Sequence, residues 1–251
     1  MLPIDVAAHT SRWRRRHPVD KAVLAFGLLG AAIALPPWPG AVVVGTATLA
    51  VLLAGARVPP RRLWRAARAP LGFAVTGAAT LLISLGGAHG VGFAENGAYR
   101  AGELLARTVA ASLAVLLFAF TTPLSDVLPR LVRCGVPAAV VDVAAVMYRM
   151  VFLLLDTTAR IRHAQAGRLG HATRGAEWRA VAGLGATVFV HAFARARRLQ
   201  DGLAGRGYDG TLHVLVDGDP VSRRFVTLSL AFVAAVVTAA LVITPLAPEL
   251  P

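Results

Sequence analysis

Long uncharged apolar runs, separated by clusters of arginine, make up the pattern along this chain. The first run, 22–56, is interrupted at 36–40 by the sequence PPWPG. Proline removes a backbone donor and clashes in a helix interior, so this segment should break the run into a tight helical hairpin. We expect one helix near 20–36 and a second near 40–56. Each approaches the roughly 20 apolar residues that a membrane-spanning helix needs.

Three further apolar runs predict membrane-spanning helices. The first covers 69–85 and stops before the glycine-rich stretch 86–92, which we interpret as a loop. The other two cover 102–122 and 225–246. The sequence therefore predicts an all-α, polytopic helical membrane protein with about five transmembrane helices.

Two other apolar stretches are weaker candidates for spanning helices. The stretch 138–155 contains Asp142 and Arg149, and the stretch 180–194 has only 15 uncharged positions and includes His191. Charge at the centre of a bilayer is costly, so we expect both stretches to lie outside the membrane-spanning set.

The arginines decide the orientation of the spans. With five spans, the inner side holds five basic residues up to Lys21, five over 57–68 and fourteen over 130–224, which leaves only Arg100 and Arg107 outside. If the two weak stretches crossed, the arginines between them would lie outside. Because cytoplasmic loops are enriched in arginine and lysine, we expect a multi-pass bacterial cell-membrane protein with its N-terminus in the cytoplasm and its C-terminus outside.

The composition agrees with a membrane protein and limits the kinds of partner that we expect. Hydrophobic residues make up 56% of the chain and charged residues 16%, whereas soluble domains are about 25% charged. The net charge is +13, but the basic residues lie between apolar runs, so we expect lipid and protein partners and no nucleic acid. We divide the chain into 1–122, with the first four spans, an apolar cytoplasmic insertion at 123–222, and a final span in 223–251.

The insertion contains an internal repeat. The sequence AGRLG at 166–170 recurs as AGRGY at 204–208, at an offset of 38 residues that also places Arg160 over Arg198. Each copy closes a predicted helical stretch, 143–167 or 180–204. Glycine after a helix and arginine near its end both suit a helix C-terminus.

The repeat has two interpretations. Arg168 and Arg206, flanked by Gly167, Gly205 and Gly207, could bind two equivalent acidic grooves on a partner, because the guanidinium fork binds carboxylates bidentately. Alternatively, these arginines only set the orientation of the protein in the membrane or bind anionic lipid.

Common catalytic, nucleotide-binding and metal-binding motifs are absent from the sequence. There is no phosphate-binding loop, H-E-x-x-H, C-x-x-C or G-x-S-x-G motif, so we expect no catalysis, no metal and no cofactor on this chain. Asp142, Arg149 and Asp156 are seven residues apart and should share a helix face, either as structural ion-pairing groups or as a proton relay. An intramembrane enzyme or lipid-modifying protein that uses Arg107, Asp142, Arg149 and nearby histidines is the alternative from another class.

Several segments resemble a known family. The runs TTPLSDVL at 121–128, CGVP at 134–137 and MYRMVF at 147–152, and the ending RARR at 195–198 with GRGYDG at 205–210, are similar to the transmembrane T component of energy-coupling factor (ECF) transporters. The nearest subgroup is the cobalt type, CbiQ. The resemblance covers most of 17–210 and is strongest over 121–210.

The resemblance implies a coupling subunit of an ATP-driven importer. In that family, two cytoplasmic coupling helices end in Ala-Arg-small motifs that bind two ABC-type ATPase subunits, which hold ATP and Mg²⁺, and the membrane part holds a substrate-capture (S) protein. By position, Arg168 and Arg206 would be the groove-binding arginines. Gly167 and Gly205 stand where the family usually has alanine, and Leu169 follows the first arginine. The implied substrate is cobalt, with nickel or a vitamin as alternatives.

Overall fold

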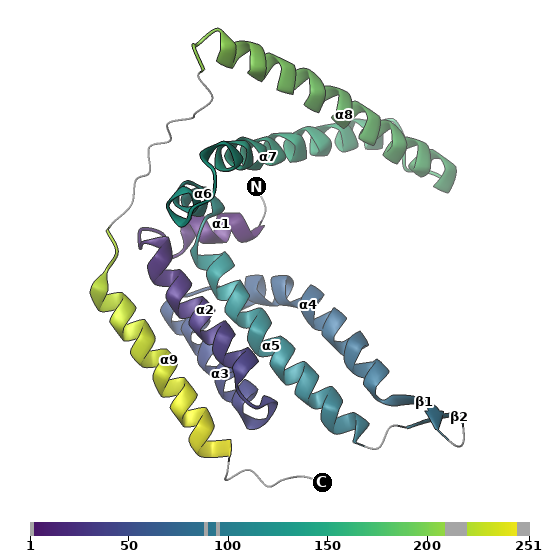
Figure 1. The fold of residues 1–251 in the computed structure, drawn as a ribbon. Helices are drawn as coiled ribbons and strands as arrows, with labels where there is room; N and C mark the ends of the chain where they lie inside the picture. Colours follow the sequence, from purple (N-terminus) through teal and green to yellow (C-terminus); the bar gives the residue numbers. More distant parts are fainter. Residues whose placement is uncertain (1–2, 88–89, 94–95, 209–219, 245–251) are drawn as a thin grey trace. The chain divides into compact units, whose positions relative to one another are not determined.

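The computed structural model describes residues 3–87, 90–93, 96–208 and 220–244, which are almost entirely helical (Figure 1). These residues form two compact units. The larger unit contains 3–123 and 220–244, and the smaller unit contains 124–208. The chain is an all-α polytopic membrane protein, as predicted.

The larger unit consists of six helices and a short β-hairpin within its described residues. The helices are α1 (Pro3–Thr10), α2 (Pro18–Ala34), α3 (Val42–Ala50), α4 (Pro60–Leu81), α5 (Gly97–Thr121) and α9 (Arg223–Ile243). The strands are β1 (Ile83–Gly87) and β2 (Gly90–Phe93), and they pair antiparallel.

Helix α5 is the centre of the larger unit. It contacts α1, α2, α3 and α4, while α9 packs on α2 and α3. Leu28, Leu117 and Phe120 are almost fully buried in this core. A Cβ placed on Gly45 would lie 3.6 Å from the Ala110 Cβ, so α3 and α5 approach closely through small residues, as helices in membranes commonly do.

The predicted helical hairpin of the first apolar run is confirmed. Helix α2 ends at Ala34, and Trp38 has extended backbone angles (φ −120°, ψ 126°) between two short helical segments. Apart from Trp38, the chain is helical over Pro37–Gly55, with single π-helical turns at Pro37–Ala41 and Val51–Gly55 on either side of α3.

The third apolar run differs from the prediction at both ends. Helix α4 begins at Pro60, within the arginine cluster, because proline suits the first turn of a helix. It continues through Pro70 and ends at Leu81. The stretch predicted as a glycine-rich loop instead contains the β1–β2 hairpin, in which Ile83 pairs with Phe93.

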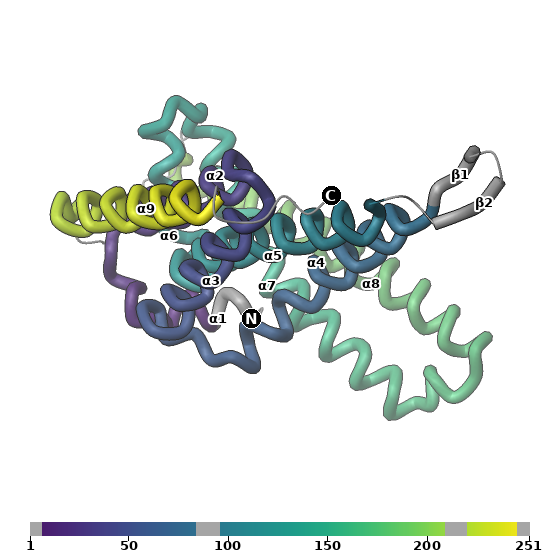
Figure 2. The backbone as a smooth tube through the Cα atoms, turned by 90° about the horizontal axis from the view of Figure 1, so that it is seen from below, coloured from purple at the N-terminus to yellow at the C-terminus, as the bar shows by residue number. Residues whose placement is uncertain are grey.

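The smaller unit contains α6 (Leu124–Leu131), a 3₁₀ turn (Val132–Cys134), α7 (Ala138–Gly167) and α8 (Arg174–Ala204). Figure 2 shows α7 and α8 as a long helical hairpin joined at the turn that follows Gly167. The Gln165 Nε2 donates to the Ala180 carbonyl at 2.9 Å, which links the two helices near that turn.

Among the described residues, four helices are long and apolar enough to cross a membrane. Three of them match predicted spans: Pro37–Gly55, Gly97–Thr121 and Arg223–Ile243. The fourth is Ala138–Gly167, which we had assigned to the cytoplasmic insertion. Helix α2, with 17 residues, and α4, with its arginines, fall outside these limits, so the count of five spans stays a prediction.

Candidate functional site

The end of α7 is built as a Schellman motif around Arg168. The Gly170 N–H donates to the Gln165 carbonyl at 2.9 Å, and the Leu169 N–H donates to the Ala166 carbonyl at 3.0 Å. These are the two bonds that define the motif, and they satisfy carbonyls that the end of a helix leaves open. Arg168 occupies the last half-helical position, and its side chain is exposed.

The end of α8 repeats this geometry 38 residues later. The Tyr208 N–H donates to the Leu203 carbonyl at 3.1 Å, and the Gly207 N–H donates to the Ala204 carbonyl at 3.1 Å. Arg206 therefore occupies the same position as Arg168, and it is also exposed. The repeat predicted from the sequence is confirmed as a repeat of backbone structure.

The two ends differ at the residue after the arginine. Leu169 has a φ of 57° and Gly207 a φ of 73°, so both lie in the left-handed region that favours glycine. The first copy instead carries glycine one position later, where a Cβ on Gly170 would lie 2.9 Å from the Gln165 carbonyl oxygen. A Cβ on Gly167 would meet nothing within 4 Å, so alanine would also fit there.

Arg168 lies six residues before the start of α8, and Arg206 lies two residues after its end. This helix has 31 residues, so at about 1.5 Å per residue it is about 46 Å long. Arg160 and Arg198, predicted as supporting residues, are exposed on α7 and α8, each eight residues before its helix-ending arginine. One surface groove of ordinary size is too short to contact both ends of a helix of this length.

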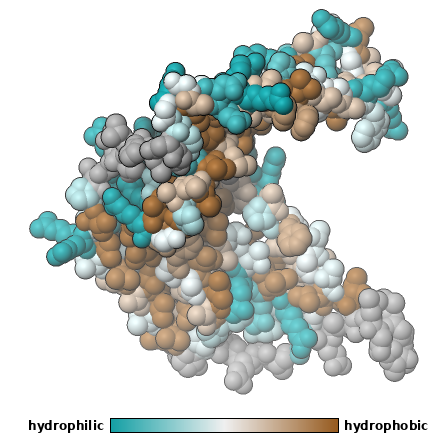
Figure 3. Space-filling model, turned by 45° about the horizontal axis from the view of Figure 1, so that its top comes forward, coloured by the Kyte–Doolittle hydropathy of each residue, from teal (hydrophilic) through white to brown (hydrophobic). Residues whose placement is uncertain are grey.

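Large apolar side chains are exposed along both helices of the hairpin. Met147 on α7 is 62% exposed, and Trp178 and Phe189 on α8 are 76% and 71% exposed. Figure 3 shows apolar and polar side chains mixed on the visible surface of these helices. Such faces are typical of surfaces that contact a partner or lipid.

The predicted charged face of α7 is present but does not assemble into one site. Asp142, Arg149 and Asp156 all lie on this helix, spaced by seven residues, which is about 10 Å for each step. Asp142 is buried, whereas Arg149 and Asp156 are exposed. At these separations, neighbouring members of the set cannot contact one another directly along the helix.

Arg107, the other residue of the enzyme alternative, has a structural role. Its Nη2 donates to the Leu35 carbonyl at 3.1 Å and so closes the end of α2. Among the described residues, no three His, Cys, Asp or Glu side chains are grouped to hold a metal ion.

Sequence reasoning missed a buried charged pair at the start of α2. Lys21, the one lysine of the chain, is 2% exposed, and its Nζ donates to the Thr121 carbonyl at 2.7 Å. Asp20 is 1% exposed, and its Oδ2 accepts from the Ser222 N–H at 3.2 Å. Together they connect α2 to the end of α5 and the start of α9. Adjacent opposite charges at the edge of an apolar run were the signal for it.

A family model described as cobalt transport protein, CbiQ, matches residues 10–215. The chain belongs to the CbiQ family. This confirms the resemblance to the cobalt-type T component that the motifs of 121–210 indicated.

Individual relatives support the assignment to the CbiQ family. The cobalt transport protein CbiQ of Rhodobacter capsulatus is 42% identical over 237 residues, which are 94% of this chain and 96% of that protein. The CbiQ of Salmonella typhimurium is 26% identical over 85% of this chain and all of its own length. A putative fused cobalt transport protein, CbiMQ, of Methanocorpusculum labreanum is 26% identical over 74% of this chain and 32% of the fused protein.

Proposed function

We propose that this chain is the transmembrane coupling subunit of an ATP-driven ECF-type importer, with cobalt or the chemically similar nickel ion as substrate. The observation that carries the proposal is the pair of matching helix ends that present Arg168 and Arg206. Family membership and the names of the relatives support cobalt as the substrate.

In this proposal, the two arginine ends bind two ABC-type ATPase subunits. Each exposed guanidinium offers a planar fork for a carboxylate. The Schellman turn fixes the backbone position from which the arginine side chain extends. The length of α8 separates the ends by a distance that suits two subunits. ATP and Mg²⁺ bind on those subunits, and no chemical step occurs on this chain.

The remaining surfaces take part in force transmission. The exposed apolar side chains of α7 and α8 contact the ATPases, the membrane surface or a substrate-capture protein in the bilayer. The fused CbiMQ relative joins a CbiQ-like part to further sequence in one chain, which supports a membrane partner for this chain. ATP biases the assembly between two arrangements through contacts that differ between them.

The test is co-purification of the chain with its co-expressed ATPase subunits after mild detergent extraction. Wild type should retain the ATPases, and the Arg168→Ala/Arg206→Ala variant should lose them. Arg174→Ala/Arg179→Ala is the matched control, because it removes two exposed arginines from the same hairpin outside the repeat. Equal retention by the wild type and the Arg168→Ala/Arg206→Ala variant would refute the docking role.

Lysine replacements separate docking from the lipid-scaffold alternative. Lipid attraction depends on charge, whereas a carboxylate groove depends on the fork of the guanidinium. Arg168→Lys/Arg206→Lys should therefore lose most of the ATPase while it keeps membrane binding. Full retention of the ATPase by the lysine variant would favour a general electrostatic contact.

A further inference from the structure

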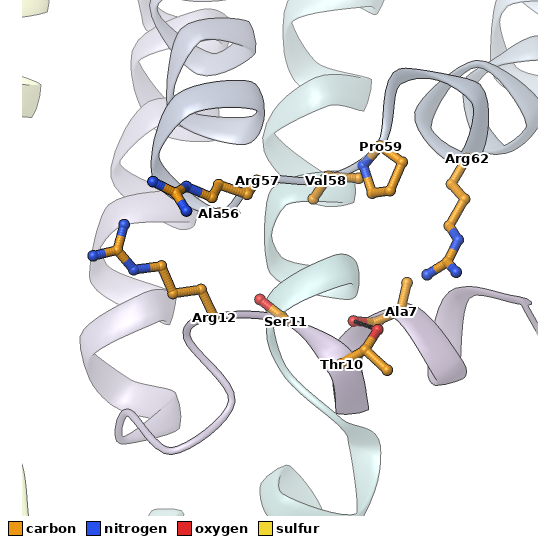
Figure 4. Close-up of a pocket in the computed structure, with 9 residues that line it drawn as sticks. All are labelled: Ala7, Thr10, Ser11, Arg12, Ala56, Arg57, Val58, Pro59 and Arg62. Atoms are coloured by element: carbon orange, nitrogen blue, oxygen red, sulfur yellow. Dashed lines mark hydrogen bonds between the residues drawn. The ribbon is translucent and has the colours of Figure 1, made fainter.

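A basic pocket in the larger unit has no role in the coupling mechanism. It has a volume of about 310 Å³ and lies between the end of α1 and the linker that joins the second predicted span to α4 (Figure 4). Its wall contains three arginines, Arg12, Arg57 and Arg62, together with Thr10 and Ser11. Both segments that form it are predicted to be cytoplasmic.

The polar groups of the pocket are hydrogen-bond donors. No carboxylate among the described side chains pairs with Arg12, Arg57 or Arg62, and a guanidinium has no acceptor atom. The Ser11 Oγ accepts from the Trp13 N–H at 3.3 Å, which leaves its O–H for a ligand. The Thr10 hydroxyl donates within α1, to the Ala7 carbonyl at 3.2 Å. A pocket with this donor set fits the oxygens of an anion.

The three arginines of the pocket come from both of the segments that form it. In Figure 4, the side chains of Arg12 and Arg57 both extend toward the left of the view, and Arg62 extends toward Ala7. Unpaired guanidinium groups that line one pocket repel each other, and an anion between them would remove that repulsion. Phosphate suits the position because arginine binds its oxygens bidentately.

The floor of the pocket is apolar. Ala7, Ala56 and Val58 line it and are 6%, 2% and 6% exposed. A second, apolar groove is lined by Trp13, Gly55 and Phe225, among others. Arg12 and Ala56 line the basic pocket, and their chain neighbours Trp13 and Gly55 line the apolar groove. A ligand with a charged head and an apolar chain could therefore occupy both.

Arg57 has a backbone φ of 53°, in the left-handed region that favours glycine. The linker nevertheless carries arginine there. Val58 beside it is fixed, since its N–H donates to the Leu52 carbonyl at 3.0 Å and its side chain is buried. Glycine at position 57 would relieve the backbone and remove the whole arginine side chain, guanidinium included.

We propose that this pocket binds the phosphate group of an anionic phospholipid from the cytoplasmic leaflet. Its acyl chain would run along the apolar groove beside Trp13. This site does not include the ATPase-docking arginines, so its test is independent of the test of the proposed function.

The test is native mass spectrometry of the full-length chain in detergent, titrated with phosphatidylglycerol. The Arg12→Gln/Arg57→Gly/Arg62→Gln variant should lose the tightest binding event, with affinity lower by about fivefold per arginine and roughly 100-fold in all. The matched control, Arg14→Gln/Arg15→Gln/Arg61→Gln, removes the same charge from the same two segments outside the pocket lining and should bind as wild type does.

Two further binding measurements identify the source of the phosphate. Phosphatidylcholine should bind at least about tenfold more weakly than phosphatidylglycerol, since it carries no net negative charge. Inorganic phosphate, measured by equilibrium dialysis, should not bind at concentrations that leave the lipid bound. Equal loss of binding in the control variant, equal binding of phosphatidylcholine, or binding of inorganic phosphate in place of the lipid would each overturn the proposal.

Discussion

Leu169 and Gly207 occupy the same left-handed backbone position at the ends of α7 and α8, and only Leu169 carries a Cβ that makes this conformation unfavourable. A left-handed φ costs a residue with a Cβ about 1 kcal/mol or more, whereas glycine adopts it freely. Leu169 is also 75% exposed, so no burial within the described chain offsets this cost. The end of α7 is therefore the less stable of the two.

Exchanging these residues should change the two helix ends in opposite directions. Leu169→Gly should stabilise the last turn of α7, and Gly207→Leu should destabilise the last turn of α8, each by about 1 kcal/mol. Hydrogen–deuterium exchange at Gln165 to Gly170 and at Leu203 to Tyr208 measures both. The same direction of change in both variants would show that backbone strain does not set the stability of these turns.

Lys21 is the residue whose loss should most affect the larger unit. Lys21→Met keeps the length of the side chain but leaves the buried Thr121 carbonyl without its donor, which costs about 1–3 kcal/mol. We expect a melting temperature in detergent several degrees below that of wild type. Arg15→Met, at an exposed position, is the control and should melt with wild type. An unchanged melting temperature for Lys21→Met would contradict the structural role of this bond.

At the scale of the elements, the sequence predicted the ends of helices better than their beginnings. The AGR motifs placed the helix ends at 167 and 204, where α7 and α8 do end, because glycine and the Schellman turn are local features. The starts of these helices lie five or six residues earlier than predicted. Pro137 and Thr173 precede them, and the Thr173 side chain accepts from the Ala176 N–H at 3.2 Å as a helix cap.

The candidate site could be predicted where it depends on local sequence and not where it depends on packing. Arg168 and Arg206 could be found from the repeat alone. The contacts of Lys21 with Thr121 and of Arg107 with Leu35 join positions 100 and 72 residues apart, so a local pattern can mark the charged residue but cannot identify its partner. The basic pocket likewise forms from two segments that only the fold brings together.

Helix α8 should behave as a continuous rod. In a Cys134→Ser background, spin labels at positions 174 and 204 should lie about 45 Å apart, and labels at 174 and 192 about 27 Å apart. Pulsed electron paramagnetic resonance of the purified chain measures both distances. If the distance between positions 174 and 204 were shorter than expected and the distance between 174 and 192 were as expected, the helix would bend between 192 and 204.

At the scale of the whole molecule, the placement of α7 decides the topology of the chain. Helix α7 is apolar enough to cross, but the arginines on both sides of it favour the cytoplasm. In the Cys134→Ser background, we expect cysteine at Ala172 to react with a membrane-impermeant maleimide only in inside-out vesicles. Cysteine at Asn96 should react only in right-side-out vesicles. Labelling of position 172 from outside would make α7 a spanning helix.

The length of α8 has a consequence for how this chain can vary among relatives. Each residue inserted in a helix rotates everything beyond it by about 100°, so one insertion would change the direction of Arg206 while Arg168 stayed in place. Seven inserted residues would nearly restore the direction but would move Arg206 about 10 Å along the axis. Insertions and deletions between the two arginines should therefore be strongly selected against, more strongly than single substitutions that leave the length of α8 unchanged.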